Sequence, residues 1–341
     1  MPMTLDRWGT ARAVLALGTF TAAWMLASTL SVAGRERMLK IVLMAATLMA
    51  LLGFAQAAAG DHSALRFHGY HHPVGAIGTF ANRNHFADLM ALLLPLAFAF
   101  GWAAQHSEAA ARTASWYAVC AILFLATALS YSRTGFALAC IAVVATPLFL
   151  VRAHGARLRA RRWLAPTLAL VAGALAVAYY AWGGIVRRLE QDPLEDSRWQ
   201  YVEHGLAVAR AYLPWGSGLG SFRDVYAPFE PTANMGATHA AHAHNDLLQI
   251  AVEAGLPGLI LCLVFVALVV GASVRTLVAG KALPTPAKAL ALSAVIPLVH
   301  SVVDYPLRTL AVGAVFAVVL SELFAALGRV SSPATRRRHV Q

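Results

Sequence analysis

Long apolar runs separated by short polar segments make up most of the chain. A helix needs about 20 apolar residues to cross the hydrocarbon core of a bilayer, where it satisfies its own backbone hydrogen bonds. Nine runs reach or approach this length, and we expect each to span a membrane: 13–33, 39–59, 86–104, 114–131, 134–151, 163–182, 247–273, 288–304 and 309–327. The pattern therefore predicts an all-α, polytopic membrane helix bundle that forms a single domain over residues 1–341.

The composition supports this prediction. The 341 residues are 59% hydrophobic and 13% charged, whereas soluble domains are about 45–50% apolar and about 25% charged. The first run is not a cleavable signal peptide, because Trp24, Met25 and Leu26 continue it past the place where small residues would mark a cleavage site. The three cysteines lie in separate apolar runs, so we expect neither disulfides nor a cysteine-based metal site.

The basic residues are divided unevenly between the two sides of this predicted bundle. One side receives 16 of the 27 basic residues, including every lysine, against three glutamates. Positively charged loops stay in the cytoplasm, so we place that side there and the other side, with the N-terminus, outside. The net charge of +11 then reflects topology and contact with anionic lipids, and it gives no reason to expect nucleic acid as a partner.

Two polar segments lie on the outer side, at 60–85 and at 183–246. The second is a large loop between the sixth and seventh predicted spans. Its glycine-rich stretch, 214–222, predicts an irregular turn in which the backbone at Gly218 and Gly220 approaches a ligand closely.

An amphipathic helix is predicted inside the large loop. Residues 197–213 place apolar side chains three and four positions apart, which is typical of a helix with one buried face. Asp196 or Ser197 is the expected N-cap, and Pro214 lies beyond the expected end.

Histidines are concentrated on the outer side, which raises the question of a metal site, because imidazole is the commonest metal ligand. Neither the histidines of segment 60–85 nor those of segment 183–246 show the helical i, i+4 pair with a carboxylate that zinc enzymes use. We therefore expect no metal and no other cofactor, and we interpret these histidines as amphipathic surface residues, with a bound metal as the alternative. The outer histidines are His62, His68, His71, His72, His85, His204, His239, His242 and His244.

Three outer arginines favour an anion-binding site. Arg83 lies in NRNH, Arg133 in SYSRTG and Arg198 in DSRW. Each could instead extend to phosphate headgroups of the lipid. Together they suit a diphosphate, because guanidinium groups bind phosphate oxygens bidentately. We expect the polar residues that flank Arg83 to bind substrate as well: Asn82, Asn84 and His85.

Six motifs between residues 78 and 308 resemble, in this order, the membrane-embedded O-antigen ligase and O-antigen polymerase family. Members usually carry about twelve spans, with a large periplasmic loop before the last three. Six predicted spans precede the loop here, so about three N-terminal spans of that plan are expected to be missing. The motifs are GTFANRNHFADLM, SYSRTG, DSRW, GSGLGSF, HAHNDLLQIAVEAGLPG and HSVVDYPLR.

The resemblance implies a metal-independent, inverting glycosyltransferase of the bacterial inner membrane. Its donor would be a glycan on undecaprenyl diphosphate at the periplasmic face, and its acceptor a hydroxyl of lipid A core, of another lipid-linked glycan or of a protein. Arg133 and Arg198 match the family's functional arginines and would stabilise the leaving diphosphate. His244 or His242 would take the acceptor's proton, since an ordinary imidazole has a pKa near 6.5.

Supporting residues follow from the same motifs. Asn245 and Asp246 would cap the next helix and fix the histidine beside them. Asn245 is also expected to bind substrate. Asp304 and Arg308 are expected to form a supporting ion pair at the end of a span.

Several functions stay open at this point. An O-antigen ligase in lipopolysaccharide or surface polysaccharide assembly is favoured, but a polymerase or a protein O-oligosaccharyltransferase would share the motifs. A transporter would place ionisable residues near the bilayer midplane, whereas the polar residues here gather on one side. An inactive truncated homologue is the remaining alternative.

Overall fold

The computed structural model describes residues 4–60, 63–68, 75–105, 110–154, 193–230, 240–279, 283 and 285–331, with backbone only at 152–154, 193–199, 285 and 330–331. The regular elements of these residues are all helices, as the sequence predicts. They are α1 (Arg7–Thr29), α2 (Val32–Ala59), α3 (Arg83–Gln105), α4 (Ala110–Leu129), α5 (Arg133–His154), α7 (Pro193–Tyr212), α8 (Phe222–Tyr226), η1 (Ala227–Phe229), α9 (Asp246–Val278), α10 (Thr285–His300), η4 (Pro306–Arg308) and α11 (Leu310–Ser331).

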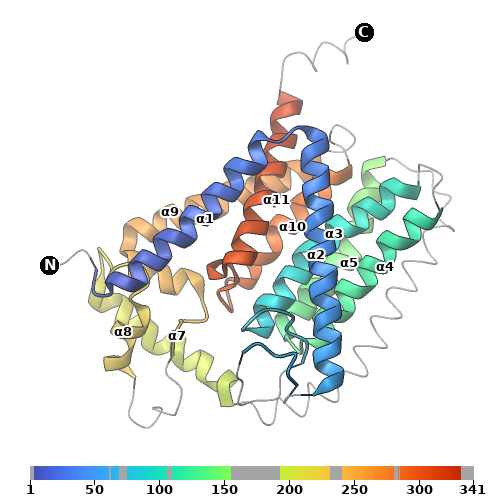
Figure 1. Cartoon of the computed structure of the whole chain (residues 1–341). Coiled ribbons are helices and arrows are strands. Elements are labelled where there is room, and N and C mark those ends of the chain that lie inside the picture. The colour runs from blue at the N-terminus through green and yellow to red at the C-terminus, as the bar shows by residue number, and fades with distance from the viewer. Residues whose placement is uncertain are drawn as a thin grey trace.

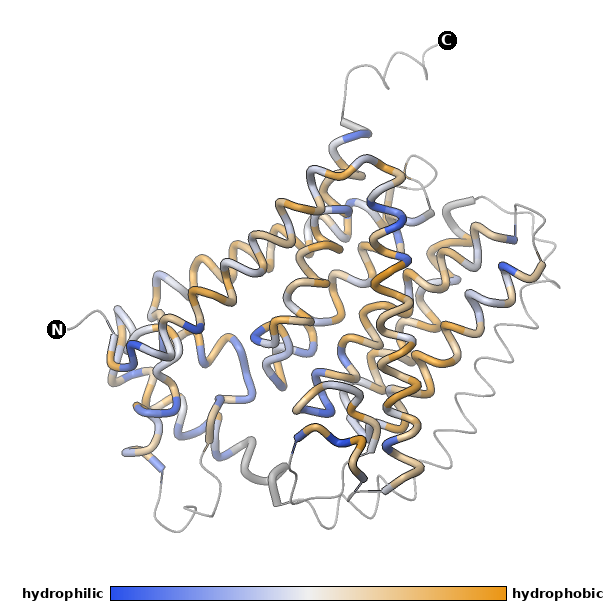
Figure 2. The backbone as a smooth tube through the Cα atoms, viewed as in Figure 1, coloured by the Kyte–Doolittle hydropathy of each residue, from blue (hydrophilic) through white to orange (hydrophobic). Residues whose placement is uncertain are grey.

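Seven of these helices are long and apolar enough to cross a membrane, and an eighth apolar helix, Pro286–His300, is shorter. Figure 2 shows hydrophobic residues along most of their length and hydrophilic residues gathered at helix ends and in connecting segments. Eight of the nine predicted runs therefore form apolar helices. The remaining run, 163–182, lies outside the described residues.

Helix α3 is the centre of the bundle (Figure 1). Nearly all of its residues are buried, because it packs against α4, α5 and α10 and also contacts α2 and α11. A contact between two buried side chains joins α10 to α3: Nδ1 of His300 lies 2.8 Å from Oδ1 of Asp88. An ionisable group inside a membrane needs such a partner, so this pair sets how α10 lies against α3.

The first two helices begin earlier than their apolar runs predict. The side chain of Asp6 caps α1 and starts it at residue 7, and the extended conformation of Leu30 ends it at residue 29. Ser31 then caps α2. The predicted starts at 13 and 39 were wrong because capping side chains, rather than hydropathy, decide where the helices begin. The predicted end at 33 was also wrong, and the predicted end at 59 is confirmed.

The amphipathic helix α7 also begins earlier than predicted. It starts at Pro193, so Asp196 and Ser197, the expected caps, lie inside it. Proline is favoured at the first helical position, and acidic residues suit the first turn because of the helix dipole. Pro214 follows the end of α7, as predicted.

Helix α9 is broken near its beginning. Gly255 has a φ of 62°, in the left-handed region that favours glycine, and Pro257 has no N–H to donate. The glycine-rich segment 214–222 fills the break: one of its carbonyls accepts from the Leu256 N–H, and two of its N–H groups donate to the carbonyls of residues 252 and 253. The predicted irregular turn is confirmed, and it divides α9 into a short half and a long spanning half.

The short half of α9, residues 246–254, belongs to a small unit at the end of the bundle. Helices α7 and α8 pack against it around a separate apolar cluster. This cluster includes Ala243, the residue between two of the candidate histidines, and so holds their segment in place. Its members are Val208, Ala209, Phe222, Val225, Tyr226, Ala240, Ala243, Leu248 and Val252.

Helices α3, α5, α9 and α11 begin at the same end of the bundle, beside this unit (Figure 1). The start of a helix carries a partial positive charge and unpaired N–H groups. At the opposite end, Nε of Arg35 lies 3.6 Å from Oε1 of Glu322. The end where the four helices begin is therefore the one suited to anions.

Candidate active site

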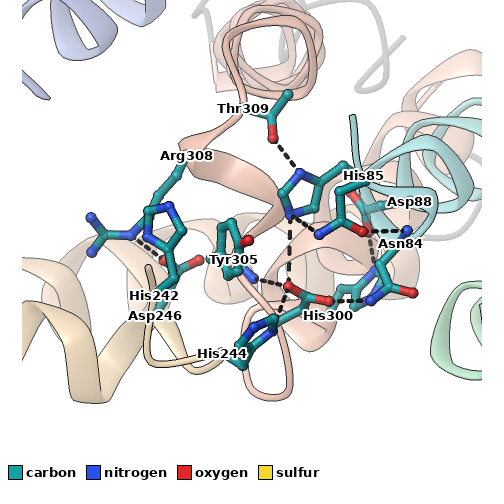
Figure 3. Close-up of polar contacts among 12 residues, drawn as sticks. Asn84, His85, Asp88, His242, His244, Asp246, His300, Tyr305, Arg308 and Thr309 are labelled. Carbon is teal, nitrogen blue, oxygen red and sulfur yellow. Dashed lines mark hydrogen bonds and ion pairs between the residues drawn. The ribbon is translucent and has the colours of Figure 1, made fainter. Parts of the chain in front are cut away.

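Polar side chains from three parts of the chain meet where α3 and α9 begin (Figure 3). They come from the first turns of α3, from the segment that leads into α9 together with its short half, and from the turn 301–309 between α10 and α11. Two buried carboxylates, Asp304 and Glu253, receive most of their contacts.

Asp304 is completely buried and lies between two histidines. Its Oδ1 is 3.6 Å from Nε2 of His85 and 3.4 Å from Nδ1 of His244. The side-chain amide of Asn84 donates to its other oxygen. Burial alone would raise the pKa of Asp304, but the hydrogen bonds and charges of His244 and His85 hold it well below its usual range. Asp304 is therefore ionised at neutral pH and can orient His244.

His244 has an uncommon backbone conformation. Its φ is 49°, in the left-handed region that few non-glycine residues adopt and that recurs at functional sites. Its neighbour Asn245 holds it there, since the Asn245 side chain accepts from the Leu248 N–H and donates to the Val302 carbonyl. The predicted N-cap is confirmed for Asn245, whereas Asp246 is the first residue of α9 and contacts Arg308 instead. The His244 side chain is 24% exposed, and because Nδ1 faces Asp304, Nε2 is the nitrogen that can take a proton.

His242 is more deeply enclosed than His244. Its Nδ1 contacts the side-chain amide of Gln249, and its ring lies 4.0 Å from the ring of Tyr305. Burial, and then the charge of Arg308, lower the pKa of His242 to about 4. His242 is therefore neutral at pH 7 and a weaker base than an ordinary imidazole.

We expect acid to destabilise the protein through His242. Its folded pKa is about 4 and its ordinary pKa is 6.5, so between these values the unfolded chain binds a proton that the folded chain does not. The stability present above pH 6.5 is then lost as the pH falls toward 4. His242→Gln cannot take this proton, so its thermal midpoint should fall less steeply with pH than that of the wild type, with His68→Gln as control. Equal slopes for the wild type and His242→Gln would contradict this expectation.

Arg308 forms two ion pairs. Its Nε lies 2.8 Å from Oδ1 of Asp246, and its Nη1 lies 3.1 Å from Oε2 of Glu253. Burial lowers the pKa of Arg308, but the carboxylates of Glu253 and Asp246 outweigh burial and raise it overall. The expected ion pair between Asp304 and Arg308 was wrong. The chain between them enters a 3₁₀ turn, which repeats every three residues, so side chains four positions apart do not share a face.

Tyr305 packs against three histidines. Its ring centroid lies 4.0 Å from that of His242, 4.7 Å from that of His85 and 5.1 Å from that of His244. Tyr201 of α7 lies nearly parallel to the ring of His244, with centroids 5.9 Å apart. These aromatic contacts restrict the orientations of the imidazoles.

Two of the predicted arginines begin helices that pack together. Arg83 is the first residue of α3 and is half-buried, and Arg133 is the first residue of α5 and is exposed. The side chain of Ser132 accepts from the Gly135 N–H at the start of α5. Tyr131, just before them, has a φ of 56°. Arg133 thus follows a strained backbone position, as His244 occupies one, at a helix start where N–H groups favour anions.

The other residues predicted to bind substrate have internal contacts. Asn84 and His85 are buried against Asp304, and Nδ1 of His85 is 2.6 Å from the hydroxyl of Thr309. The side chain of Asn82 accepts from the Asn84 N–H at the start of α3. Contact of all three with substrate stays a prediction, and Asn84 and His85 also hold Asp304 in place.

Two of the three glycines in the glycine-rich segment lie against the start of α1 and the residues just before it. Gly218 and Gly220 have φ values of 105° and 80°, and a Cβ on either would come within 2.4 Å of Thr4 or of Gly9. The hydroxyl of Thr10 donates to the carbonyl between them. Close packing against α1 is reason enough for glycine here, and the approach of a ligand stays a prediction.

Some predicted site residues cannot be placed. Arg198 lies in α7, where only the backbone is described, and His62, His71, His72 and His239 lie outside the described residues. Within the described part of the chain, no group of three or more His, Cys, Asp or Glu side chains is arranged to hold a metal ion.

Three residues of the short half of α9 were missed as a group, although their spacing gave a signal. Asp246, Gln249 and Glu253 lie three and four positions apart at the start of an otherwise apolar run, and this spacing places polar side chains on one helix face. Tyr305 gave no such signal from the sequence.

The comparison with protein families gives one match. A family model described as O-antigen ligase matches residues 118–263. The matched segment runs from α4 into α9 and contains Arg133, Arg198, His242 and His244. A search of curated proteins finds no match. The family that the motifs resemble is therefore the one whose model matches, over residues 118–263.

Proposed function

We propose that the chain transfers a glycan from undecaprenyl diphosphate to an acceptor hydroxyl at the periplasmic face of the bacterial inner membrane, as a ligase in lipopolysaccharide or surface polysaccharide assembly. The observation that carries the proposal is the contact between His244 and Asp304. A partly exposed histidine with a strained backbone faces a buried carboxylate that is ionised at neutral pH. This arrangement suits a general base.

The proposed reaction is one displacement at the anomeric carbon of the donor. The acceptor oxygen forms a bond to that carbon, while the bond from the carbon to the diphosphate oxygen breaks and its electron pair leaves with the lipid diphosphate. Nε2 of His244 takes the acceptor's proton, and the carboxylate of Asp304, whose Oδ1 lies 3.4 Å from Nδ1, stabilises the imidazolium. Attack opposite to the leaving group inverts the configuration. His242 suits this role less, because a base with a pKa of about 4 takes protons poorly at pH 7.

The proposed binding site for the donor diphosphate is formed by arginines and helix starts. Arg133 begins α5 and Arg83 begins α3, so their side chains and the first N–H groups of these helices can meet the same anion. Arg198 of α7 is the third arginine of the proposed site, and it is included because it lies in the DSRW motif. These groups neutralise the leaving diphosphate in the way that a metal ion does elsewhere, so the proposed reaction needs neither a metal nor another cofactor.

A transfer assay tests the proposal. The purified protein in lipid vesicles is given a labelled glycan on undecaprenyl diphosphate, with lipid A core, a second lipid-linked glycan or a peptide offered in separate reactions. We expect label to move to lipid A core at the same rate with and without EDTA. Label on the second lipid-linked glycan alone would assign a polymerase instead, and label on no acceptor would overturn the proposal. Loss of activity in EDTA that Mg²⁺ restores would contradict the metal-free mechanism.

A further inference from the structure

Glu253 contacts several elements around the candidate active site, and none of the roles given above explains these contacts. It lies at the end of the short half of α9 and is 1% exposed. Its carboxylate accepts from the side-chain amide of Gln249 at 2.8 Å, from Nη1 of Arg308 at 3.1 Å and from the Phe222 N–H at 3.4 Å. Its carbonyl accepts from the Gly218 N–H. One residue thus joins α9, the start of α8, the turn before α11 and the glycine-rich segment.

The contact with Gln249 leads from Glu253 to the histidines. A carboxylate only accepts hydrogen bonds, so the Gln249 side chain must present its NH₂ group to Glu253 and its oxygen in the other direction. That oxygen accepts from the Ala243 N–H at 3.2 Å, and Nδ1 of His242 lies 3.3 Å from the oxygen and 3.1 Å from the nitrogen of the Gln249 amide. Ala243 is completely buried and separates His242 from His244 in the chain. The charge on Glu253 therefore determines which way Gln249 points and which donor it can hold.

We propose that Glu253 is a positioning residue for glycosyl transfer, which acts through Gln249 on the backbone at Ala243 and so sets His244 in place. This inference rests on the proposed function of His244. Glu253 faces internal donors on both carboxylate oxygens, so it acts on the reaction through other residues and touches no substrate itself.

The isosteric change Glu253→Gln separates this role from simple packing. An amide at residue 253 can offer its NH₂ group to Gln249. The Gln249 amide can then rotate by half a turn, so that its own NH₂ group, which is a donor, faces the Ala243 N–H. The hydrogen bond to Ala243 is then lost although the shape of the side chain is kept. A small misplacement of a catalytic group costs up to about 10²-fold in rate, so we expect a loss of about 10-fold to 100-fold in the transfer step. Donor affinity should be unchanged, because the proposed diphosphate site lies on other residues.

The test measures single-turnover transfer from donor bound in advance, together with donor affinity, in full-length protein in vesicles. Glu253→Gln and Gln249→Ala are compared singly and together. Asp224→Asn is the matched control, because Asp224 is an exposed carboxylate on α8 in the same small unit. We expect each single variant to lose rate without losing donor affinity, the double variant to be no slower than the slower single one, and the control to match the wild type. Non-additive losses of this kind indicate one shared route.

The outcomes distinguish this inference from the proposed function. Wild-type protein that transfers to no acceptor overturns the proposed function and the positioning role with it. Wild-type activity together with an unchanged rate in Glu253→Gln overturns the positioning role alone, as does a double variant whose losses multiply. If Glu253→Gln fails to fold, Gln249→Ala decides, because it keeps the pair between Glu253 and Arg308; a wild-type rate in that variant overturns the inference.

Discussion

Alanine in place of His244 is expected to slow single-turnover glycosyl transfer by about 10²–10⁴-fold, the usual contribution of a positioned general base. The reason is that the attacking hydroxyl must lose its proton as the new bond forms, and Nε2 of His244 is the nitrogen left to take it once Nδ1 faces Asp304. The measurement is the rate at saturating donor, normalised to the amount of folded protein in the vesicles.

Two further variants make this result specific. Asp304→Asn should also slow transfer, because an amide can turn its NH₂ group toward His244 and favour the wrong tautomer. His68→Ala, which removes an exposed histidine of another loop, should leave the rate unchanged. If His242→Ala abolished transfer while His244→Ala retained most of it, the base would be the other histidine.

Removing an arginine should weaken donor binding as well as transfer. A charge-assisted hydrogen bond contributes about 1.5–3 kcal/mol, so Arg133→Ala and Arg198→Ala should each raise the dissociation constant of the donor by about 10-fold to 150-fold. Lysine at either position should recover only part of the affinity, because it keeps the charge but lacks the bidentate fork. The affinity is measured with the undecaprenyl diphosphate-linked glycan in vesicles.

A matched arginine controls for general charge. Arg223 is exposed on α8, in the small unit beside the site, and Arg223→Ala should leave donor affinity within about twofold of the wild type if its charge acts only at long range through salt-screened solvent. An equal loss of affinity in Arg223→Ala and Arg133→Ala would show that the diphosphate responds to the overall charge of this end and not to a specific site.

The helices were predictable because a span in lipid imposes a length and a composition that hydropathy reads directly. Their ends were less predictable, since short polar interactions decide them. The Asp6 cap, the extended Leu30 and the Pro193 start each moved a boundary. The break in α9 was not predicted for a different reason: Gly255 and Pro257 interrupt the helix but leave the run apolar enough to span a membrane.

The candidate site was predictable in its motifs and not in its contacts. Arg133 and His244 stand out because they are charged or titratable groups at the ends of apolar runs. Their partners come from distant parts of the sequence. Local spacing does not indicate that Asp304 contacts His244, or that Arg308 pairs with Glu253 and not with Asp304. Those choices follow from how α10 packs on α3 and from the 3₁₀ turn before α11, which only the folded bundle defines.

The donor affinity of His244→Ala tests the central claim, that this histidine moves a proton while the arginines hold the diphosphate. A base removed from a site whose binding groups are intact changes the rate and not the ground-state affinity. The dissociation constant of the lipid-linked donor should therefore lie within about twofold of the wild-type value in a variant whose transfer is slowed by about 10²-fold or more. A loss of donor affinity as large as that of Arg133→Ala, with no separate defect in the transfer step, would contradict the account and make His244 a phosphate ligand.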